Sequence, residues 1–293
     1  MIGILSVVAA ALAATTFPAE IPAGSPAGDT AADVRAYWTP ERMREAVVAT
    51  DGAAEPPDGV PWTLGAEPVR NVGRLFLTVP PAEEGGKERK AYCSAAVVDS
   101  ANRSVVVTAG HCVHLKSIPG GWVKKLLFVP AYDKKSEPYG SYVAESVGIA
   151  PAWAEHEDHK ADFAFVTLGK DEQGRSVQDV TGARKASFAP VAGEKTALGY
   201  PFLKPYDGET LQYCSGPTTP VTDNRLVGGE QLKPCRMTNG ASGGPWYART
   251  PQGEDVQVGV TSSRPKDEAF QDAAWGAMFD ATARELFQAQ ERK

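Results

Sequence analysis

Short apolar runs, each bounded by turn-forming residues, dominate the chain from residue 72 onward. Runs rich in Val, Phe and Leu between Gly, Pro, Asn and Asp predict many short β-strands and few helices. Such a succession is typical of β-sandwiches and β-barrels. Two sets of strands, which could form two similar halves joined near residues 171–185, are expected over 72–79, 91–98, 104–109, 126–129, 163–168, 196–200, 211–214, 245–248, 256–261 and 274–279.

Two segments carry helical patterns instead. Residues 33–48 predict one helix, with Thr39 as N-cap and Pro40 at the first position. Residues 280–290 predict a C-terminal helix with Asp280 as N-cap. Because Pro, Gly, Ala and acidic residues flank the first helix, we interpret residues 15–70 as a propeptide or linker. The alternative is a helix packed on the surface of the domain.

The first residues form an unbroken apolar run from Ile2 to Ala14, followed by no further apolar span long enough to cross a membrane. The run is too short for a mature transmembrane helix, and Ala11-Leu12-Ala13 offers a small-residue cleavage site. It lacks a positively charged start. We interpret residues 1–14 as a secretory signal peptide, the alternative being a frayed N-terminal helix.

The composition is that of an ordinary globular protein, and its net charge argues against some classes of partner. The 293 residues carry a net charge of −6, with 42% hydrophobic and 23% charged residues, which is ordinary for a globular protein with ample core. The acidic balance argues against nucleic-acid and anionic-membrane partners.

The four cysteines, Cys93, Cys112, Cys214 and Cys235, form no CxxC pair, which argues against a zinc ribbon. Four cysteines allow three pairings, and we favour the two local ones, Cys93–Cys112 and Cys214–Cys235. Each would stabilise the fold by about 3 kcal/mol on the loop-entropy model. Disulfides in turn indicate an oxidising compartment.

The stretch from Thr238 to Trp246, TNGASGGPW, holds the candidate nucleophile, Ser242. Flanking glycines let the backbone adopt positive φ, so that N–H groups can face an oxyanion while a hydroxyl attacks a carbonyl. A glycine-rich turn that happens to contain serine is the alternative.

A serine hydroxyl needs a base, which in turn needs an orienting carboxylate. His111 follows an apolar strand and a glycine and precedes Cys112, so a disulfide would hold its turn in place. Asp162 opens the apolar run 163–168, with Asp158 as a second choice. His156 and His159 could instead ligate a metal, but a solvated polar loop explains them more simply, and we expect no metal.

These three segments resemble the motifs of trypsin/chymotrypsin-type serine peptidases. The histidine motif is TAGHC at 108–112, the aspartate motif is DFAFVTL at 162–168, and the serine motif is GASGGP at 240–245. They stand in the family's order, and the resemblance covers about residues 72–290. The stretch WTPERMR at 38–44 is similar to a prosegment pattern of secreted bacterial members.

The resemblance implies an all-β, chymotrypsin-like fold of two six-stranded antiparallel β-barrels with a short C-terminal helix. Residues 71–180 would form the barrel that carries His111, the general base, and Asp162, which orients it. Residues 181–293 would form the barrel that carries Ser242, the nucleophile. The backbone N–H groups of Gly240 and Ser242 would form the oxyanion hole, and Cys93–Cys112 would clip the histidine loop.

Two departures from the family pattern bear on activation and specificity. Ala241 replaces the aspartate that pairs with a new N-terminus in many members, so this activation switch should be absent. Cys235 lies further upstream of the serine than usual, which leaves the specificity pocket hard to place. Candidate wall residues for substrate binding are Arg236, Met237, Thr238, Thr261 and Ser262.

Other hydrolase classes fit less well. The sequence around Ser242 also matches the G-x-S-x-G elbow of α/β-hydrolases, but that fold needs a histidine after the serine, and all four histidines precede it. A subtilisin would need strand–helix alternation. A non-catalytic relative would typically lack a triad member. We therefore expect a secreted, extracellular, monomeric serine endopeptidase that acts on proteins or peptides, without cofactor and without a membrane anchor in its mature form.

Overall fold

A computed structural model of the chain describes residues 29–46, 60–61, 69–134, 136–263 and 272–293. The predicted signal peptide at 1–14 and most of the predicted linkers lie outside these residues. None of the helices in the described ranges is both long and apolar enough to cross a bilayer.

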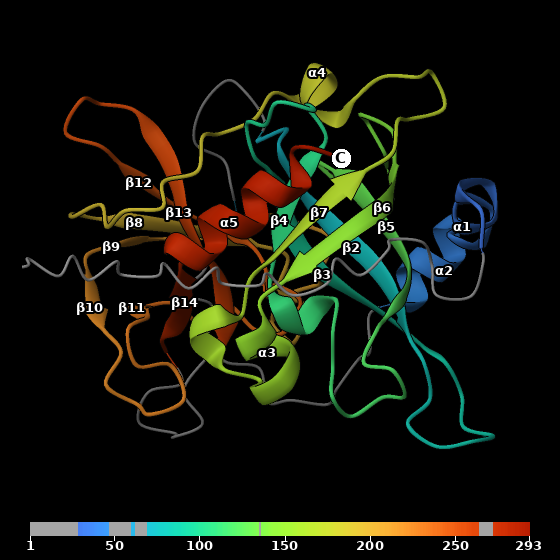
Figure 1. Ribbon diagram of the computed structural model, residues 1–293, viewed down its shortest axis with the longest axis horizontal. Helices are drawn as coiled ribbons and strands as arrows, with labels where there is room; N and C mark the ends of the chain where they lie inside the picture. The colour runs from blue at the N-terminus through green and yellow to red at the C-terminus, as the bar shows by residue number, and fades with distance from the viewer. Residues whose placement is uncertain (1–28, 47–59, 62–68, 135, 264–271) are drawn as a thin grey trace, which may run out of the picture.

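The first half of the domain is a closed antiparallel barrel of six strands. Its order is β2-β3-β4-β7-β6-β5, and it lies on the right in Figure 1. Barrel closure buries apolar side chains from every strand, mostly Val, Phe and Leu, in one core. The strands are β2 (Val72–Val79), β3 (Arg89–Val97), β4 (Val105–Thr108), β5 (Lys124–Pro130), β6 (Tyr142–Ile149) and β7 (Ala164–Leu168).

The second half is an antiparallel sheet of order β1-β9-β8-β12-β13-β14-β11-β10, on the left in Figure 1. Seven of its strands curve into a nearly closed barrel, and β1 adds an edge by pairing with β9. The strands are β1 (Val60–Pro61), β8 (Lys195–Gly199), β9 (Gln212–Gly216), β10 (Thr218–Pro220), β11 (Glu230–Leu232), β12 (Pro245–Arg249), β13 (Asp255–Ser263) and β14 (Ala274–Met278).

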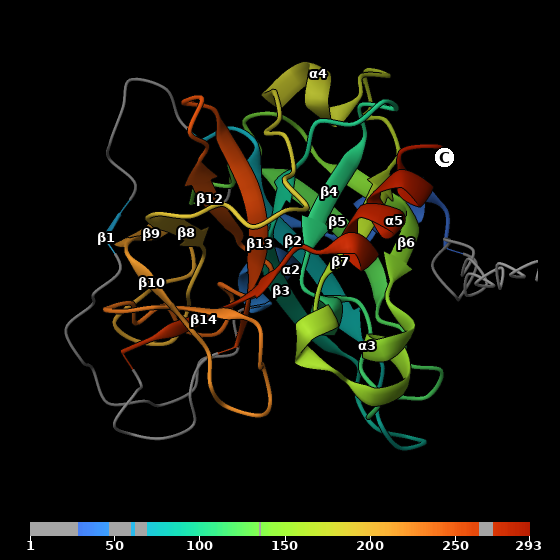
Figure 2. The ribbon, with the colours of Figure 1, turned by 60° about the vertical axis from the view of Figure 1, so that its left-hand side comes forward.

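The predicted chymotrypsin-like arrangement of two antiparallel barrels is thus confirmed, with six strands in the first and eight in the second sheet, where six were expected. Helices are short, as predicted. Besides the N-terminal pair they are η1 (Gly110–Cys112), α3 (Pro151–His156), η2 (His159–Ala161), α4 (Val177–Thr181) and α5 (Ala281–Gln290). Asp280 caps α5 through the Ala283 N–H, as predicted, and α5 packs on β6 and β7 (Figure 2).

The predicted helix over 33–48 is instead two helices, α1 (Ala31–Tyr37) and α2 (Pro40–Glu45). Thr39 is the N-cap of α2, as predicted, and Thr30 forms a capping box on α1. An N-cap residue takes extended backbone angles, so Thr39 ends the first helix as it starts the second.

The helix pair packs on the first barrel. Trp38 is 3% exposed and its indole N–H donates to the Lys125 carbonyl, 2.7 Å away. Met43 is buried in the same apolar cluster, and Glu45 forms an ion pair with Lys90 of β3. Residues 29–46 therefore pack on the first barrel in the uncleaved chain, a contact that both a propeptide and a surface helix can make.

Candidate active site

His111 and Asp162 meet at one end of the first barrel. His111 lies in η1, directly after β4, and Asp162 lies between η2 and β7. Because β4 pairs with β7, from Thr108 opposite Ala164 to Val105 opposite Thr167, the two turns at the strand ends lie side by side. The barrel's own pairing therefore brings together two residues 51 positions apart in the chain.

Two hydrogen bonds join this pair. The backbone N–H of His111 donates to Asp162 Oδ1 at 2.8 Å, and His111 Nδ1 lies 2.9 Å from Asp162 Oδ2. A carboxylate that accepts at Nδ1 keeps the proton there, so Nε2 is left free to accept one. The Asp162 side chain is fully buried, whereas the His111 side chain is 27% exposed.

Electrostatics favour the charged form of both groups. Burial alone would lower the pKa of the His111 imidazole, but the charge and hydrogen bond of Asp162 outweigh it, and the pKa is raised. Burial alone would raise the pKa of Asp162, but His111 and a hydrogen bond from Ser262 outweigh it, and the pKa is lowered. Asp162 therefore stays ionised, ready to stabilise an imidazolium.

The third hydrogen bond to Asp162 comes from the other half of the molecule. Ser262 of β13 is buried, and its hydroxyl donates to Asp162 Oδ2 at 2.5 Å. His159 Nδ1 lies 3.4 Å from the same hydroxyl. Sequence reasoning placed Ser262 on the substrate pocket wall, and nothing in the sequence signals its contact with a residue 100 positions earlier.

The Ser242 turn lies against the histidine turn. A Cβ at Gly243 would collide with the Thr108 side chain and would lie only 2.7 Å from the Ala109 nitrogen. The Gly243 N–H donates to the Thr261 carbonyl at 2.8 Å, which ties the turn to β13 next to Ser262. Glycine is required here because φ is +77° and the backbones touch. The residues flanking Ser242 thus contact those flanking His111.

The Ser242 side chain is half-buried and, among the described residues, its hydroxyl makes no hydrogen bond, to His111 or to any other group. Nucleophile–base bonds are often long in free enzymes and shorten in the substrate complex. The backbone on both sides of Ser242 is held by hydrogen bonds, and the His111 imidazole is partly exposed to solvent.

The backbone N–H groups of Gly240 and Ser242 belong to peptides whose carbonyls are each held by a hydrogen bond. The carbonyl of Asn239 accepts from Phe202 at 2.9 Å, and that of Ala241 accepts from Gly244 at 2.9 Å. In a trans peptide the N–H points opposite to the C=O, so both N–H groups point away from these partners. Within the described residues neither N–H donates a hydrogen bond. Such a pair can stabilise an oxyanion.

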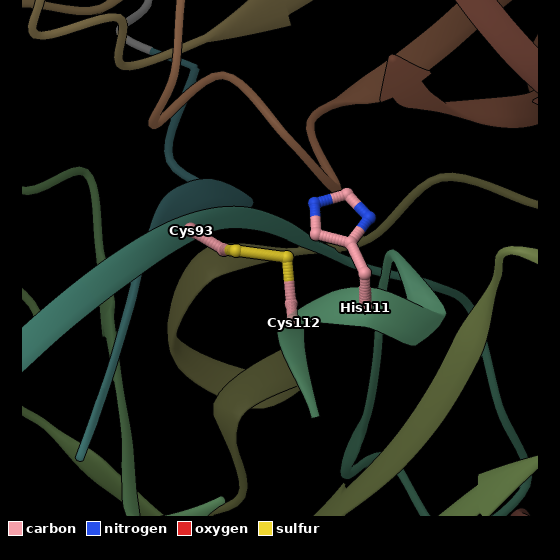
Figure 3. A group of neighbouring side chains, drawn as sticks. All are labelled: Cys93, His111 and Cys112. Carbon is pink, nitrogen blue, oxygen red and sulfur yellow. A yellow bond between two sulfur atoms is a disulfide. The ribbon is translucent and has the colours of Figure 1, made fainter. Parts of the chain in front are cut away.

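Both predicted disulfides are present, Cys93–Cys112 and Cys214–Cys235. The first links β3 to η1 and lies beside the His111 imidazole (Figure 3). In the described part of the chain, Cys93, His111 and Cys112 are the one trio of metal-binding side chains within ligand distance of each other. Because the two sulfurs are bonded to each other, they cannot act as thiolate ligands.

The other polar residues near Asp162 have separate partners. Asp158 caps η2 by accepting from the Lys160 N–H at 3.0 Å, so it does not replace Asp162. His156 is exposed and pairs with Glu155, away from the His159–Ser262 contact.

Two of the candidate pocket residues bond to the serine turn, since the Thr238 carbonyl accepts from the Ala241 N–H and the Thr261 carbonyl accepts from the Gly243 N–H. Met237 and Thr261 are buried, and the Trp246 indole N–H donates to Thr261 Oγ1 at 3.0 Å. Thr238 Oγ1 accepts from Leu203, and Arg236 is half-buried.

Comparison with known proteins gives one consistent family. A family model described as Trypsin matches residues 82–272. The protease Anisep from Arthrobacter nicotinovorans superposes with a TM-score of 0.67 and 30% identity, over 77% of this chain and 97% of its own. The thermostable serine protease AL20 from an extremophilic microorganism gives a TM-score of 0.65 and 30% identity, over 77% of this chain and 98% of its own.

Two further matches carry less information. A Glu endopeptidase shares the fold with a TM-score of 0.59 at 15% identity, over 83% of this chain and all of its own. An extracellular metalloprotease of Bacillus subtilis is 30% identical over 105 residues, which are 36% of this chain. The match spans only 33% of that protein's length.

Proposed function

Because this chain belongs to the trypsin family of serine proteases, we propose that it is a secreted endopeptidase with His111, Asp162 and Ser242 as its triad. The observation that carries the proposal is the double hydrogen bond between His111 and Asp162, set against the backbone of the Ser242 turn. Protein and peptide chains are the substrates.

The reaction follows from the roles of these groups. His111 Nε2 takes the Ser242 hydroxyl proton as Oγ attacks the scissile carbonyl carbon, and Asp162 stabilises the imidazolium. The N–H groups of Gly240 and Ser242 bind the resulting oxyanion. The imidazolium then protonates the leaving amine, which departs as the acyl-enzyme forms, and water attacks that ester in the same way.

A matched pair of serine variants tests this assignment, because Ser262 is a second serine beside Asp162 and His159. The Ser262 hydroxyl already donates to a buried carboxylate, so it orients Asp162 and does not attack substrate. We expect Ser242→Ala to lose about 10⁶-fold in kcat, as for removal of a nucleophile in serine proteases. Ser262→Ala should retain most activity in the same casein-cleavage assay.

The outcomes separate the alternatives. Hydrolysis that survives Ser242→Ala and disappears in Ser262→Ala would move the nucleophile to Ser262. A folded wild-type protein that cleaves no peptide bond would favour a non-catalytic binding module.

The substrate-binding cleft is proposed to include Arg236, Met237, Thr238 and Thr261. The carbonyls of Thr238 and Thr261 accept from the N–H groups of Ala241 and Gly243, on either side of Ser242. Ser262 belongs with them through its main chain only, since its hydroxyl bonds to Asp162. Cleavage of a peptide library identifies the preferred side chain.

Secretion and processing are part of the proposal. Two disulfides and the likeness to an extracellular bacterial protease support export to an oxidising compartment. We propose a signal peptide at 1–14, a propeptide at 15–70, and a monomeric mature enzyme without cofactor.

N-terminal sequencing of the exported protein tests this processing. A mature N-terminus between residues 50 and 75 is expected. Cleavage there would leave residues 29–46 held by packing, hydrogen bonds and ion pairs, without a covalent link. A single N-terminus between residues 15 and 48 would contradict the propeptide assignment.

A further inference from the structure

Three consecutive residues of β3, from Tyr92 to Ser94, contact both the histidine turn and the second half of the molecule. They do so from opposite faces of the strand. Side chains alternate across a strand, so Tyr92 and Ser94 point one way and Cys93 the other. Cys93 lies in the core of the first barrel and is bonded to Cys112 next to His111. Tyr92 and Ser94 face the second half, where Ser242 lies.

Ser94 is fully buried and uses its hydroxyl and its backbone on the serine turn. Its hydroxyl donates to the Gly240 carbonyl at 2.8 Å and accepts from the Tyr200 N–H at 2.9 Å. Its backbone N–H donates to the Ser242 carbonyl at 2.8 Å. One residue of the first barrel therefore holds two carbonyls of the nucleophile turn.

With these bonds, the carbonyls of four successive residues, 239 to 242, each have a hydrogen-bond partner. The carbonyls of residues 239 and 241 are held from within the second half, by Phe202 and Gly244. Those of residues 240 and 242 are held by Ser94. Gly240 has φ of +94° and, as glycine, can adopt many other backbone angles. The Ser94 hydroxyl fixes the carbonyl of the peptide that connects the two donor peptides.

Tyr92 supports the same turn through Tyr200, which packs against Gly240. Its hydroxyl donates to the Tyr200 carbonyl at 2.8 Å, so residue 200 is held at its N–H by Ser94 and at its C=O by Tyr92. A Cβ at Gly240 would collide with that carbonyl and would lie 2.9 Å from the Tyr92 hydroxyl. Gly240 is thus packed directly on the Tyr92–Tyr200 pair.

We propose that Ser94, assisted by Tyr92, is the positioning residue that holds the oxyanion-binding N–H groups of Gly240 and Ser242 in place. The inference rests on the proposed function of the serine turn. Neither side chain touches the reacting atoms: both act on the backbone that does. The 240–241 peptide lies between the two peptides that carry these N–H groups. Without the Ser94 hydroxyl it loses its partner from the first barrel, so the two donors can shift relative to each other, and the transition state is bound less well while substrate binding is retained.

The test compares Ser94→Ala and Tyr92→Phe with Tyr142→Phe. Tyr142 is a matched control because it is a buried tyrosine of the same barrel whose hydroxyl also donates to a carbonyl, that of Tyr139 at 3.2 Å. We measure kcat per titrated active site and KM with a cleavable peptide amide, well below each melting temperature. A peptide aldehyde, which forms a tetrahedral adduct, reports on the hole directly.

Loss of one oxyanion donor costs about 10²–10³ in kcat, so a misplaced donor in Ser94→Ala should cost roughly 10- to 100-fold. KM should change little, and aldehyde affinity should fall in parallel with kcat. Tyr92→Phe should show a smaller loss of the same kind. Tyr142→Phe should lower the melting temperature but leave kcat per active site close to wild type.

A Ser94→Ala variant with the kcat and aldehyde affinity of Tyr142→Phe would overturn the proposal, as would a loss confined to KM. If Ser94→Ala does not fold, Tyr92→Phe decides by the same comparison. A wild-type protein that forms no acyl-enzyme would overturn the proposed function and this inference together. An active wild-type protein whose Ser94→Ala and Tyr92→Phe variants keep the wild-type kcat and aldehyde affinity would overturn this inference alone.

Discussion

The two halves of the molecule hold their parts of the site in different ways. The first barrel is closed, and it places His111 and Asp162 at the ends of its paired strands β4 and β7, where two hydrogen bonds join them and Ser262 of the second half adds a third to Asp162. The second half is not fully closed, and its Ser242 turn depends on hydrogen bonds from Ser94 across the boundary. The His111–Asp162 pair is therefore brought together by the strand pairing of one barrel, whereas the backbone of the nucleophile turn is held by hydrogen bonds from both halves.

This difference predicts how variants should behave. Changes inside the first barrel should alter the proton chemistry of His111, and changes at the boundary should alter the alignment of Ser242.

Among variants that keep the Ser242 nucleophile, replacement of the orienting carboxylate should give the largest loss of kcat. Asp162→Asn should lower kcat by about 10⁴-fold, because the imidazole loses the partner that keeps its proton on Nδ1. Asp171→Asn is a matched control, since Asp171 is another buried aspartate of this barrel region and pairs with Arg175 away from the site. Steady-state kinetics on folded protein should show a near-normal kcat for the control, and equal losses would refute the role of Asp162.

The two disulfides offer a direct comparison of the halves. Their sequence separations are 19 and 21 residues, so removal of either should cost about 3 kcal/mol of unfolding free energy. Only the Cys93–Cys112 bond lies beside His111. The double alanine variant there should lose activity at temperatures where it remains folded. The Cys214/Cys235 variant should lose stability alone, as measured by chemical denaturation beside kcat, and equal activity losses would contradict this distinction.

The smallest effect is a shift of the pH profile. The pKa of His111 is raised above its usual value because the Asp162 charge outweighs burial. Since the protonated imidazole cannot accept a proton, activity should fall as the pH drops through this raised pKa. In Asp162→Asn the charge is lost while burial remains, so the acid limb of kcat/KM should move to lower pH. A limb that stays in place would show that another group controls it.

Much of the architecture is predictable because the barrel strands are apolar runs between turn residues. Strand β6 was missed because its exposed positions, such as Glu145, and an irregular register with β7 interrupt the apolar pattern. Strands β10 and β11 have only three residues each, too few for any periodicity. The break between α1 and α2 follows from Thr39, whose capping signal also marks the end of the preceding helix.

The chemistry of the site is only partly contained in local sequence. His111, Asp162 and Ser242 each stand in a short motif that can be recognised without a structure. Ser94 and Ser262 stand in no such motif, because their roles come from contacts with residues more than 90 positions away. Supporting residues of this kind are defined by the packing of the two halves on each other.

The central claim is that Ser242 is the activated nucleophile. Its most direct test is to label the exported protein with a fluorophosphonate probe and to locate the adduct by mass spectrometry of its peptides. The account predicts one adduct, on Ser242, which is absent from the Ser242→Ala variant and greatly slowed in Asp162→Asn. An adduct on Ser262, or a folded protein that takes up no probe, would contradict it.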